Sequence, residues 1–263
     1  MTPAVLVLRL AGPLQSWGTS SRHNRRRSGI EPSKSGLVGL LAAAQGRRRT
    51  DPVEDLVALK LGVRVDRPGQ LRRDYHTVSR LDGRPLPQTG VTARGLQKPT
   101  APAKYTHVTE RHYLEEAVFV AALEGPAPFL DVLANAVREP AYPLALGRRA
   151  CPPTQPLLLA DPGGRTRWSG GVVDALSAVA WQVPQWARGG RGRRTPPVVH
   201  LPATVDDPNG DDVRDDVPIS FAPQDRRFGT RRVRQVWIST PTGEPATDDK
   251  AVGEHDPFAL LGW

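Results

Sequence analysis

The chain has 263 residues, enough to bury a substantial hydrophobic core in one large domain or two small ones. Its single cysteine, Cys151, excludes a disulfide within the chain, and no apolar run reaches the roughly 18 residues of a membrane helix, so we expect a soluble, cytoplasmic protein. The formal net charge is +9 and only five of the 36 basic residues are lysine, an arginine excess that suggests either a nucleic-acid or other anionic partner or the composition of a GC-rich genome.

The N-terminal part of the chain predicts a strand, a helix and a second strand. Residues 4–10 are rich in Val and Leu and open the chain as a strand. A helix is predicted from Ser33 to Gln45, with Gly46 as its C-terminal cap. Apolar and polar residues then alternate over 59–67, which is the period of a half-buried strand.

Residues 68–112 differ from what precedes them, because they are polar and basic with little apolar periodicity. Long excursions of this kind inside compact domains are usually functional or disordered. Beyond the excursion the pattern predicts a strand over 113–125, a helix over 128–140 and a short strand over 142–149.

The resulting order is the βαββαβ pattern of an α+β, ferredoxin-like (RRM-like) domain, which we expect to occupy residues 1–150. A basic arm would be inserted between its two middle strands. Both helices would cover one face of the sheet and leave the other face free to meet RNA, as in RNA-recognition modules.

Residues 151–263 have a weaker pattern, with stretches rich in Pro and Gly, and we expect a small β-rich C-terminal lobe there. The acidic stretch 206–216 is interpreted as a solvated loop. Short strands are expected near 157–160, 172–183, 196–202 and 231–240.

The start of the first helix, Pro32-Ser33-Lys34-Ser35-Gly36, is a candidate anion site, since free N–H groups and the helix dipole favour negative charge there. A nucleotide-triphosphate loop is excluded, because Ser33 stands where the second glycine of that motif is required. Two interpretations stay open: an RNA phosphate bound beside Lys34, or an ordinary cap with a solvated lysine.

The loop 12–27 combines Trp17 with flanking glycines and an arginine cluster. An aromatic ring beside arginines is the composition of a single-strand stacking surface. The alternative is that Trp17 folds back onto the core and leaves a basic loop.

Three histidines, His76, His107 and His112, lie in or next to the basic arm. Metal-free RNA cleavage would need such groups as base and acid, but no fixed spacing identifies a catalytic set, and histidines in basic arms are more often RNA contacts or surface residues. One cysteine and six scattered histidines give no metal-ligand spacing, and we expect neither a metal nor a cofactor.

Five ordered segments of the chain together resemble one family, the CasD subunits of type I-E CRISPR Cascade, which belong to the RAMP superfamily. The resemblance covers residues 4–160 strongly and the remainder weakly. Its segments are Leu8–Gly18, Pro32–Leu41, Gly62–Asp66 with Asp74–Thr77, Arg111–Leu114 with Ala117 and Phe119, and Leu146–Pro153.

The resemblance implies a ferredoxin-like RNA-binding domain that holds the repeat-derived 5′ handle of a CRISPR RNA. It also implies a thumb at about 77–111 that hooks over the RNA and meets the CasC backbone subunit, and contact with the large subunit that reads the PAM. Target DNA would be reached only through the complex, and no membrane is involved. The C-terminal part is longer than this family pattern predicts.

Motif matching and charge select a set of RNA-binding candidates. Phosphates are expected at the first helix start and at the paired arginines, bases at the aromatic residues, and further contacts from the thumb. The set is Gln15, Ser16, Trp17, Ser33, Lys34, Ser35, Tyr75, His76, Arg80, Lys104, Arg111, Arg148 and Arg149.

The leading hypothesis is therefore a non-catalytic RNA-binding subunit that caps the 5′ handle and organises an antiviral complex. The alternative is a metal-independent endoribonuclease that cuts repeat RNA through His76, His107 or His112. A third hypothesis, a DNA-facing basic module, predicts equal affinity for DNA and RNA handles.

Overall fold

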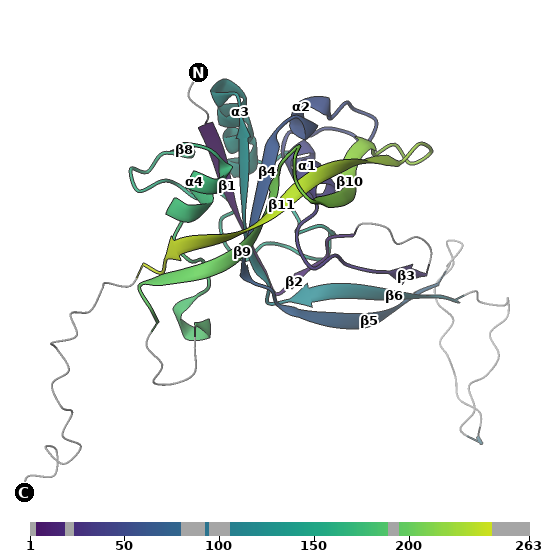
Figure 1. Ribbon diagram of the computed structural model, residues 1–263. Helices are drawn as coiled ribbons and strands as arrows, with labels where there is room; N and C mark the ends of the chain where they lie inside the picture. Colours follow the sequence, from purple (N-terminus) through teal and green to yellow (C-terminus); the bar gives the residue numbers. More distant parts are fainter. Residues whose placement is uncertain (1–3, 19–23, 80–92, 95–105, 189–194, 244–263) are drawn as a thin grey trace, which may run out of the picture.

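The computed structural model describes the chain except for residues 1–3, 19–23, 80–92, 95–105, 189–194 and 244–263. Its strands form two sheets, a central one of seven strands with helices on both faces and a second one of four strands that projects from it (Figure 1). Within the described part of the chain, no helix is long and apolar enough to cross a membrane.

One half of the central sheet comes from the N-terminal two thirds of the chain. Its neighbouring strands run in the order β4-β7-β1-β8, and each neighbouring pair is antiparallel. Their bounds are β1 (Ala4–Ala11), β4 (Lys60–Arg67), β7 (Val118–Gly125) and β8 (Arg167–Ser169). Strand β1 lies between β7 and β8, and its Val and Leu side chains are buried on both faces of the sheet.

Helices α1 (Lys34–Ala44), α2 (Glu54–Val57) and α3 (Ala127–Arg138) lie on one face of this sheet (Figure 1). The larger hydrophobic core fills the space between them and the sheet. Its fully buried members include Leu6 and Leu8 from β1, Leu37 and Leu41 from α1, and Leu130 from α3. The expected strand at 4–10 and the expected helices at 33–45 and 128–140 are present.

The opposite face of the sheet, which we expected to be open for RNA, is covered. Residues 172–183 do not form the predicted strand; they begin with helix α4 (Val172–Ala178). Val172, Ala175, Leu176 and Val179 are all buried and recur with the helical period, so this segment packs its apolar stripe on the sheet. The sequence prediction missed this period because the stretch is also rich in β-branched residues.

The C-terminal strands extend the same sheet. They are β9 (Val198–Asp206), β10 (Asp212–Ser220) and β11 (Arg227–Pro241), in the order β10-β11-β9, and β9 pairs with β4. The expected strands near 196–202 and 231–240 correspond to β9 and β11. The acidic stretch 206–216, interpreted as a solvated loop, instead begins at the end of β9 and continues into β10. A domain boundary near residue 150 stays a prediction.

A buried ion pair joins the sheet to the segment that begins with α4 and covers this face. Arg64 and Asp66 are adjacent on one face of β4, their side chains are fully buried, and Arg64 Nε lies 2.7 Å from Asp66 Oδ1. Arg64 Nη1 also donates to the carbonyl of Val179 (2.7 Å) and to Thr240 Oγ1 (2.9 Å), while Asp66 accepts from the backbone N–H of Gln182 (2.7 Å). Burial raises the pKa of Asp66, and the bonds from Arg64 oppose that rise.

The second sheet contains the excursion that was expected at 68–112. Its longest strands, β5 (Gln70–Ser79) and β6 (Thr106–Glu115), form an antiparallel hairpin, flanked by β2 (Leu14–Gln15) and β3 (Arg25–Arg26) on the other side of β6. The predicted single strand at 113–125 is therefore divided. The chain turns at Glu116, which has a φ of +55°, between β6 and β7.

The short strand predicted at 142–149 is absent, and these residues form turns instead. The position beside β1 is taken by β8 and by the bridge between Leu8 and Leu158. Gly147 explains why the predicted strand does not form, because its φ is +86° and a Cβ there would lie 2.0 Å from the carbonyl oxygen of Ser16. The segment is shaped for close approach to residue 16 rather than for sheet pairing. A 3₁₀ turn, Gln185–Ala187, completes the described helices.

Candidate nucleic-acid interface

Three of the predicted RNA contacts, Gln15, Ser16 and Trp17, are buried. Gln15 Nε2 donates to the carbonyls of Leu10 (3.0 Å) and Ala117 (2.8 Å), and its Oε1 accepts from Trp17 Nε1 (3.0 Å). Trp17 is fully buried in the larger core. Its ring is therefore closed to stacking with bases in this structure, and the alternative interpretation, a tryptophan folded back onto the core, is the observed one.

The Trp17 ring rests directly on the start of α1. A Cβ added at Gly36 would lie 2.7 Å from Trp17 Cε3, so only glycine lets the helix approach the ring this closely. Two motifs that are separate in the sequence thus form one packing unit.

The anion at the start of α1 is supplied by the chain itself. Ser33 caps the helix, its Oγ accepting from the backbone N–H of Gly36 (3.2 Å), as expected. The backbone N–H of Lys34 donates to Asp216 Oδ2 (2.7 Å), and Lys34 Nζ lies 2.9 Å from Asp206 Oδ2. Ser33, Lys34 and Ser35 are all buried, so the predicted phosphate contact is replaced by an internal one.

Arg231 completes this internal cluster. Its Nε lies 2.7 Å from Asp216 Oδ1, and it also pairs with Asp206. Burial alone would lower the pKa of Arg231, but its bonds with Asp216 and Asp206 outweigh that effect and raise it. Asp206 additionally accepts from the backbone N–H of Leu61 (3.0 Å). The cluster ties α1, β4, β9, β10 and β11 together and serves structure.

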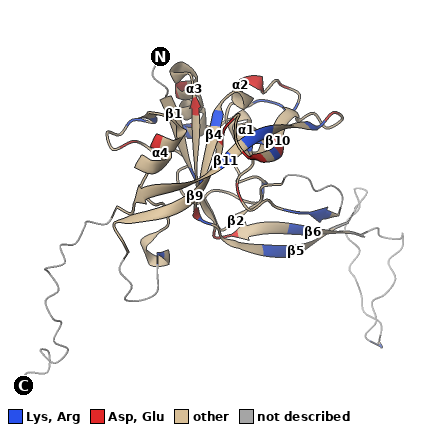
Figure 2. Ribbon diagram, viewed as in Figure 1, with Lys and Arg blue, Asp and Glu red and all other residues tan. Residues whose placement is uncertain are grey.

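The remaining predicted residues belong to the second sheet, where strand register sorts side chains onto two faces. Figure 2 shows positive residues on β3, β5 and β6. We call one side the arginine face; its members are Arg26, Arg72, Asp74, His76, Thr109, Arg111 and Tyr113. We call the other side the tyrosine face; its members are Arg25, Leu71, Arg73, Tyr75, Val108, Glu110 and His112.

Arg148 joins the arginine face from the turn at 146–149. Its guanidinium lies over the Tyr113 ring, 5.0 Å from the centroid, and its Nη2 donates to the carbonyl of Arg26 (2.9 Å). The turn is held by Ser16, whose N–H donates to the carbonyl of Leu146 (3.1 Å) and whose Oγ donates to the carbonyl of His112 (3.0 Å). The segments around residues 16, 112 and 148 therefore meet at one place.

The second sheet carries more positive charge than its acidic residues balance. Glu110 pairs with Arg25 (3.2 Å) and Glu115 with Arg72 (2.9 Å), and the hydrogen bond from Arg25 lowers the pKa of Glu110. Five other arginines, on this sheet or on the adjoining turn at 146–149, have no ion pair among the described residues. They are Arg26, Arg73, Arg111, Arg148 and Arg149.

Tyr75 and His76 are exposed on opposite faces. Tyr75 is 59 % exposed, and the Arg73 guanidinium lies over its ring at 5.1 Å from the centroid. His76 Nδ1 lies 3.8 Å from Asp74 Oδ2. The Tyr75 ring and the neighbouring Arg73 have the composition of a base-stacking surface.

The structure separates two of the histidines considered for catalysis. His76 pairs with Thr109 and so lies on the arginine face, whereas His112 lies on the tyrosine face. They cannot act on the same phosphate as base and acid. The side chain of His107 lies outside what the structure describes. Among the described residues, no group of three His, Cys, Asp or Glu is arranged to hold a metal ion.

Two predicted thumb contacts, Arg80 and Lys104, lie outside the described residues. Conversely, Arg26, Arg72 and Arg73 were absent from the predicted set, although they lie on the second sheet. The signal that would have found them is the alternation within Gln70–Ser79, which places arginine on both faces of a strand.

Comparison with known proteins identifies the family. Residues 5–234 match the model of the family described as CRISPR-associated protein (Cas_Cas5). The CRISPR system Cascade subunit CasD of Escherichia coli (strain K12) is 38% identical over 171 residues, which are 59% of this chain and 69% of that protein.

Two solved structures share the fold over nearly the whole chain. One, titled "CRISPR RNA-guided surveillance complex", has a TM-score of 0.70 and 36% identity, and the match covers 94% of this chain and 95% of the other. The second, titled "Crystal structure of Cas protein", has a TM-score of 0.64 and 32% identity, over 92% of this chain and 100% of the other. The chain belongs to the CRISPR-associated Cas5 family.

Proposed function

We propose that this chain is a non-catalytic, RNA-binding subunit of a type I-E Cascade complex and that it caps the 5′ handle of the CRISPR RNA. One observation carries the proposal: arginines that have no ion pair with any described residue gather where β3, the β5–β6 hairpin and the turn at 146–149 meet. Its relative in Escherichia coli is described as a Cascade subunit, and a structural neighbour comes from an RNA-guided complex.

In this proposal the arginine face holds phosphates and the tyrosine face holds a base. Arg26, Arg111, Arg148 and Arg149 would neutralise successive phosphates, as basic grooves do along single strands. Tyr75 offers an exposed ring for a splayed base. This set keeps part of the sequence prediction and omits the buried residues at 15–17 and 33–35.

The finer fold assignment belongs to the same proposal. Strand order β4-β7-β1-β8 with α1 and α3 on one face fits a ferredoxin-like unit in which β8 is the fourth strand. The β5–β6 hairpin would be the base of the thumb that meets the CasC backbone subunit. Contact with the large PAM-reading subunit, indirect contact with target DNA and a cytoplasmic location are part of the proposal.

The test is to express the whole chain with a repeat–spacer transcript, recover the bound RNA and map its ends. Bound, uncut RNA enriched in repeat sequence supports the proposal. RNA cut at one place in the repeat would instead establish the endoribonuclease alternative.

A matched pair of triple variants locates the interface. Replacing Arg26, Arg111 and Arg148 by Ala should abolish RNA recovery. Replacing the exposed Arg138, Arg165 and Arg227 by Ala changes net charge equally and should leave recovery intact. Equal loss in both would show that only overall charge matters and would contradict the proposed interface.

A further inference from the structure

Strand β5 forms the outer edge of the second sheet. It pairs with β6 on one side, and among the described residues no strand pairs with its other side. Figure 1 shows β5 at the border of this sheet, with no described helix or strand beyond it. Residues 70–77 are all exposed. An open edge of this kind presents unpaired backbone N–H and C=O groups, which can pair with a strand of another chain.

The two edges of the central sheet are protected, whereas β5 is not. Strand β8 has only three residues, and β10 carries Asp212, Asp215 and Pro218 along its edge. Short length, charge and proline are features that discourage pairing at an edge. Strand β5 is ten residues long and contains no proline. It also carries charges of both signs, so its side chains can match those of a suitable strand.

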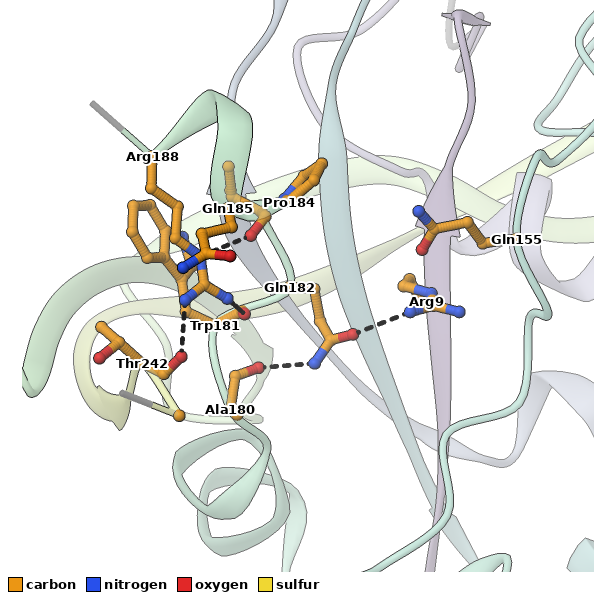
Figure 3. Close-up of a pocket in the computed structure, with 11 residues that line it drawn as sticks. Arg9, Gln155, Ala180, Trp181, Gln182, Pro184, Gln185, Arg188 and Thr242 are labelled. Atoms are coloured by element: carbon orange, nitrogen blue, oxygen red, sulfur yellow. Dashed lines mark hydrogen bonds between the residues drawn. The ribbon is translucent and has the colours of Figure 1, made fainter. Parts of the chain in front are cut away.

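The polar groups at a hollow next to residues 180–185 are in a different state, because they bind one another (Figure 3). Arg9 Nη1 donates to Gln182 Oε1 (3.3 Å), and Gln182 Nε2 donates to the carbonyl of Ala180 (2.8 Å). Arg188 Nη1 donates to the carbonyl of Thr242 (2.9 Å). These donors already have acceptors within the chain, so the open backbone groups of β5 are the stronger sign of a missing partner.

Hydrogen bonds on the far side of β6 show which backbone groups of β5 point outward. The N–H of Glu110 donates to the carbonyl of Asn24 (2.8 Å), and the carbonyl of His112 accepts from Ser16 Oγ (3.0 Å). Even-numbered residues of β6 therefore turn their backbone groups away from β5, and odd-numbered residues bond to it. The register pairs those odd-numbered residues with even-numbered residues of β5. The described residues of β5 whose backbone groups point outward are thus Leu71, Arg73, Tyr75 and Thr77.

The outward-pointing residues also carry exposed apolar side chains. Leu71 and Tyr75 are 63% and 59% exposed, and both lie on the tyrosine face together with Arg73. A strand added at this edge would form backbone hydrogen bonds and cover these side chains at the same time. Strand addition of this kind is a common mode of protein association.

The sequence of β5 fits a second copy of itself in one antiparallel register. In a pair with two-fold symmetry, the residue at the axis faces itself, and residues equally far from it on opposite sides face one another. An axis at Arg72, Arg73 or Asp74 would set a charge against the same charge, which is unfavourable. An axis nearer either end of β5 shortens the paired length. An axis at Tyr75 keeps the length and sets ring against ring.

The axis at Tyr75 also matches the neighbouring side chains. On the arginine face, Asp74 of each copy faces His76 of the other, an acid opposite a base. On the tyrosine face, Arg73 of each copy faces Thr77 of the other, beside the two Tyr75 rings. Facing pairs of aromatic rings or of acid and base stabilise antiparallel strands. The outward backbone groups face one another in this register, as an antiparallel ladder requires.

We propose that two copies of the RNA-free chain pair through β5 in this register. The two second sheets join into one continuous sheet across the axis at Tyr75, and each facing pair of outward residues exchanges two hydrogen bonds. The contact consists of one strand pair, far smaller than a standard stable interface, so the dimer is weak and forms reversibly with concentration. It closes an edge that is otherwise open to unspecific pairing.

Pairing covers the Tyr75 ring, so the dimer and the RNA complex exclude each other. This consequence rests on the proposed function, whereas the dimer itself does not. Experiments on the full chain without RNA therefore test the dimer alone, and their failure would leave the RNA-binding proposal untouched.

Cysteine cross-linking tests the register. Mild oxidation of the Tyr75→Cys chain should give a disulfide-linked dimer, because the two thiols face each other at the axis. Arg73→Cys is the matched control on the same face and edge; its two copies lie at least about 13 Å apart along the strands, beyond the reach of a disulfide. The native Cys151 is buried and is present in both variants. An equal yield of dimer from both variants, or a higher yield from Arg73→Cys, would overturn the proposal.

Two substitutions at His76 test the facing pair with Asp74, and sedimentation velocity over a concentration series measures dimerisation. His76→Lys should strengthen dimerisation severalfold and His76→Asp should weaken it severalfold, because the pair occurs twice in the dimer. General repulsion between two copies of a chain with a net charge of +9 predicts the reverse order, since the lysine raises the net charge and the aspartate lowers it. The reverse order, or a wild-type chain that stays monomeric up to about 1 mM, would overturn the proposal.

Discussion

Asp216 accepts a hydrogen bond at 2.7 Å from the backbone N–H of Lys34, the first residue of α1, although 182 positions separate them in the chain. A helix start that resembles a phosphate site therefore already holds an anion, a carboxylate from β10. The same carboxylate binds Arg231, so one side chain compensates both the helix dipole and a buried cation.

Removing this carboxylate should destabilise the protein without acting on RNA directly. Asp216→Ala leaves Arg231 partly unpaired in a buried setting, and we expect a loss of about 3 kcal/mol in the free energy of unfolding. Asp215→Ala, at an exposed neighbour, should cost under about 0.5 kcal/mol. Urea unfolding followed by circular dichroism measures both. An Asp216→Ala protein of normal stability would contradict the structural role.

Replacing each of two glycines of α1 by alanine should change the stability of the protein in opposite directions. Gly36→Ala places a methyl group 2.7 Å from the Trp17 ring, and overpacking of this kind costs about 1–3 kcal/mol. Gly39→Ala meets only one atom, at 3.9 Å, so the better helix propensity of alanine should stabilise the protein by up to about 1 kcal/mol. Thermal unfolding of the two variants compares them, and the same sign for both would refute the packing argument.

Tyr75 should contribute to RNA affinity through its ring. We expect Tyr75→Ala to weaken binding of the 5′ handle by about 1–3 kcal/mol, because base–aromatic stacking has that magnitude. Tyr75→Phe keeps the ring and should bind nearly as well as the wild type. Fluorescence anisotropy with a labelled handle RNA measures both, and a similar loss in both variants would point to the hydroxyl group instead.

Arg148 and Arg149 should affect the salt dependence of RNA binding. Each phosphate contact that is removed should reduce the slope of log affinity against log salt by about one. Arg148→Ala and Arg149→Ala should each show this reduction, whereas Arg165→Ala, on a distant turn, should not. If a variant has the same slope of log affinity against log salt as the wild type, the replaced residue does not belong to the interface.

The pair Arg47–Asp55 gives a small, defined pH dependence. The hydrogen bond from Arg47 lowers the pKa of Asp55, so the pair stabilises the fold above the unfolded pKa of about 3.9 and loses that effect as pH falls through the lowered pKa. The Asp55 side chain is 45% exposed, so the effect should stay below about 1 kcal/mol. Asp55→Asn should be less stable than the wild type at pH 7 and equal to it at pH 2. A difference that persists at pH 2 would contradict this assignment.

The sequence alone determined the features that depend on local periodicity. The strand at 4–10, the helix that starts at Ser33 and the amphipathic helix after residue 127 follow from patterns within a dozen residues. The motifs around residues 17, 36, 112 and 148 were also found in order, and they are sufficient to indicate the family.

Tertiary structure alone decided what those motifs do. Whether Trp17 stacks on RNA or on Gly36, and whether Lys34 meets a phosphate or Asp206, depends on residues far away in the chain. From the sequence, the acidic residues of β9 and β10 were interpreted as a solvated loop. Their partner Lys34 is distant in the chain, and their partner Arg231 follows a turn, so the local pattern shows neither. Burial makes a charge costly unless it is paired, so the fold that brings these charges together also withdraws them from any ligand. Arg26 and Arg111 on the second sheet have no ion pair among the described residues, and they belong to the interface that we propose.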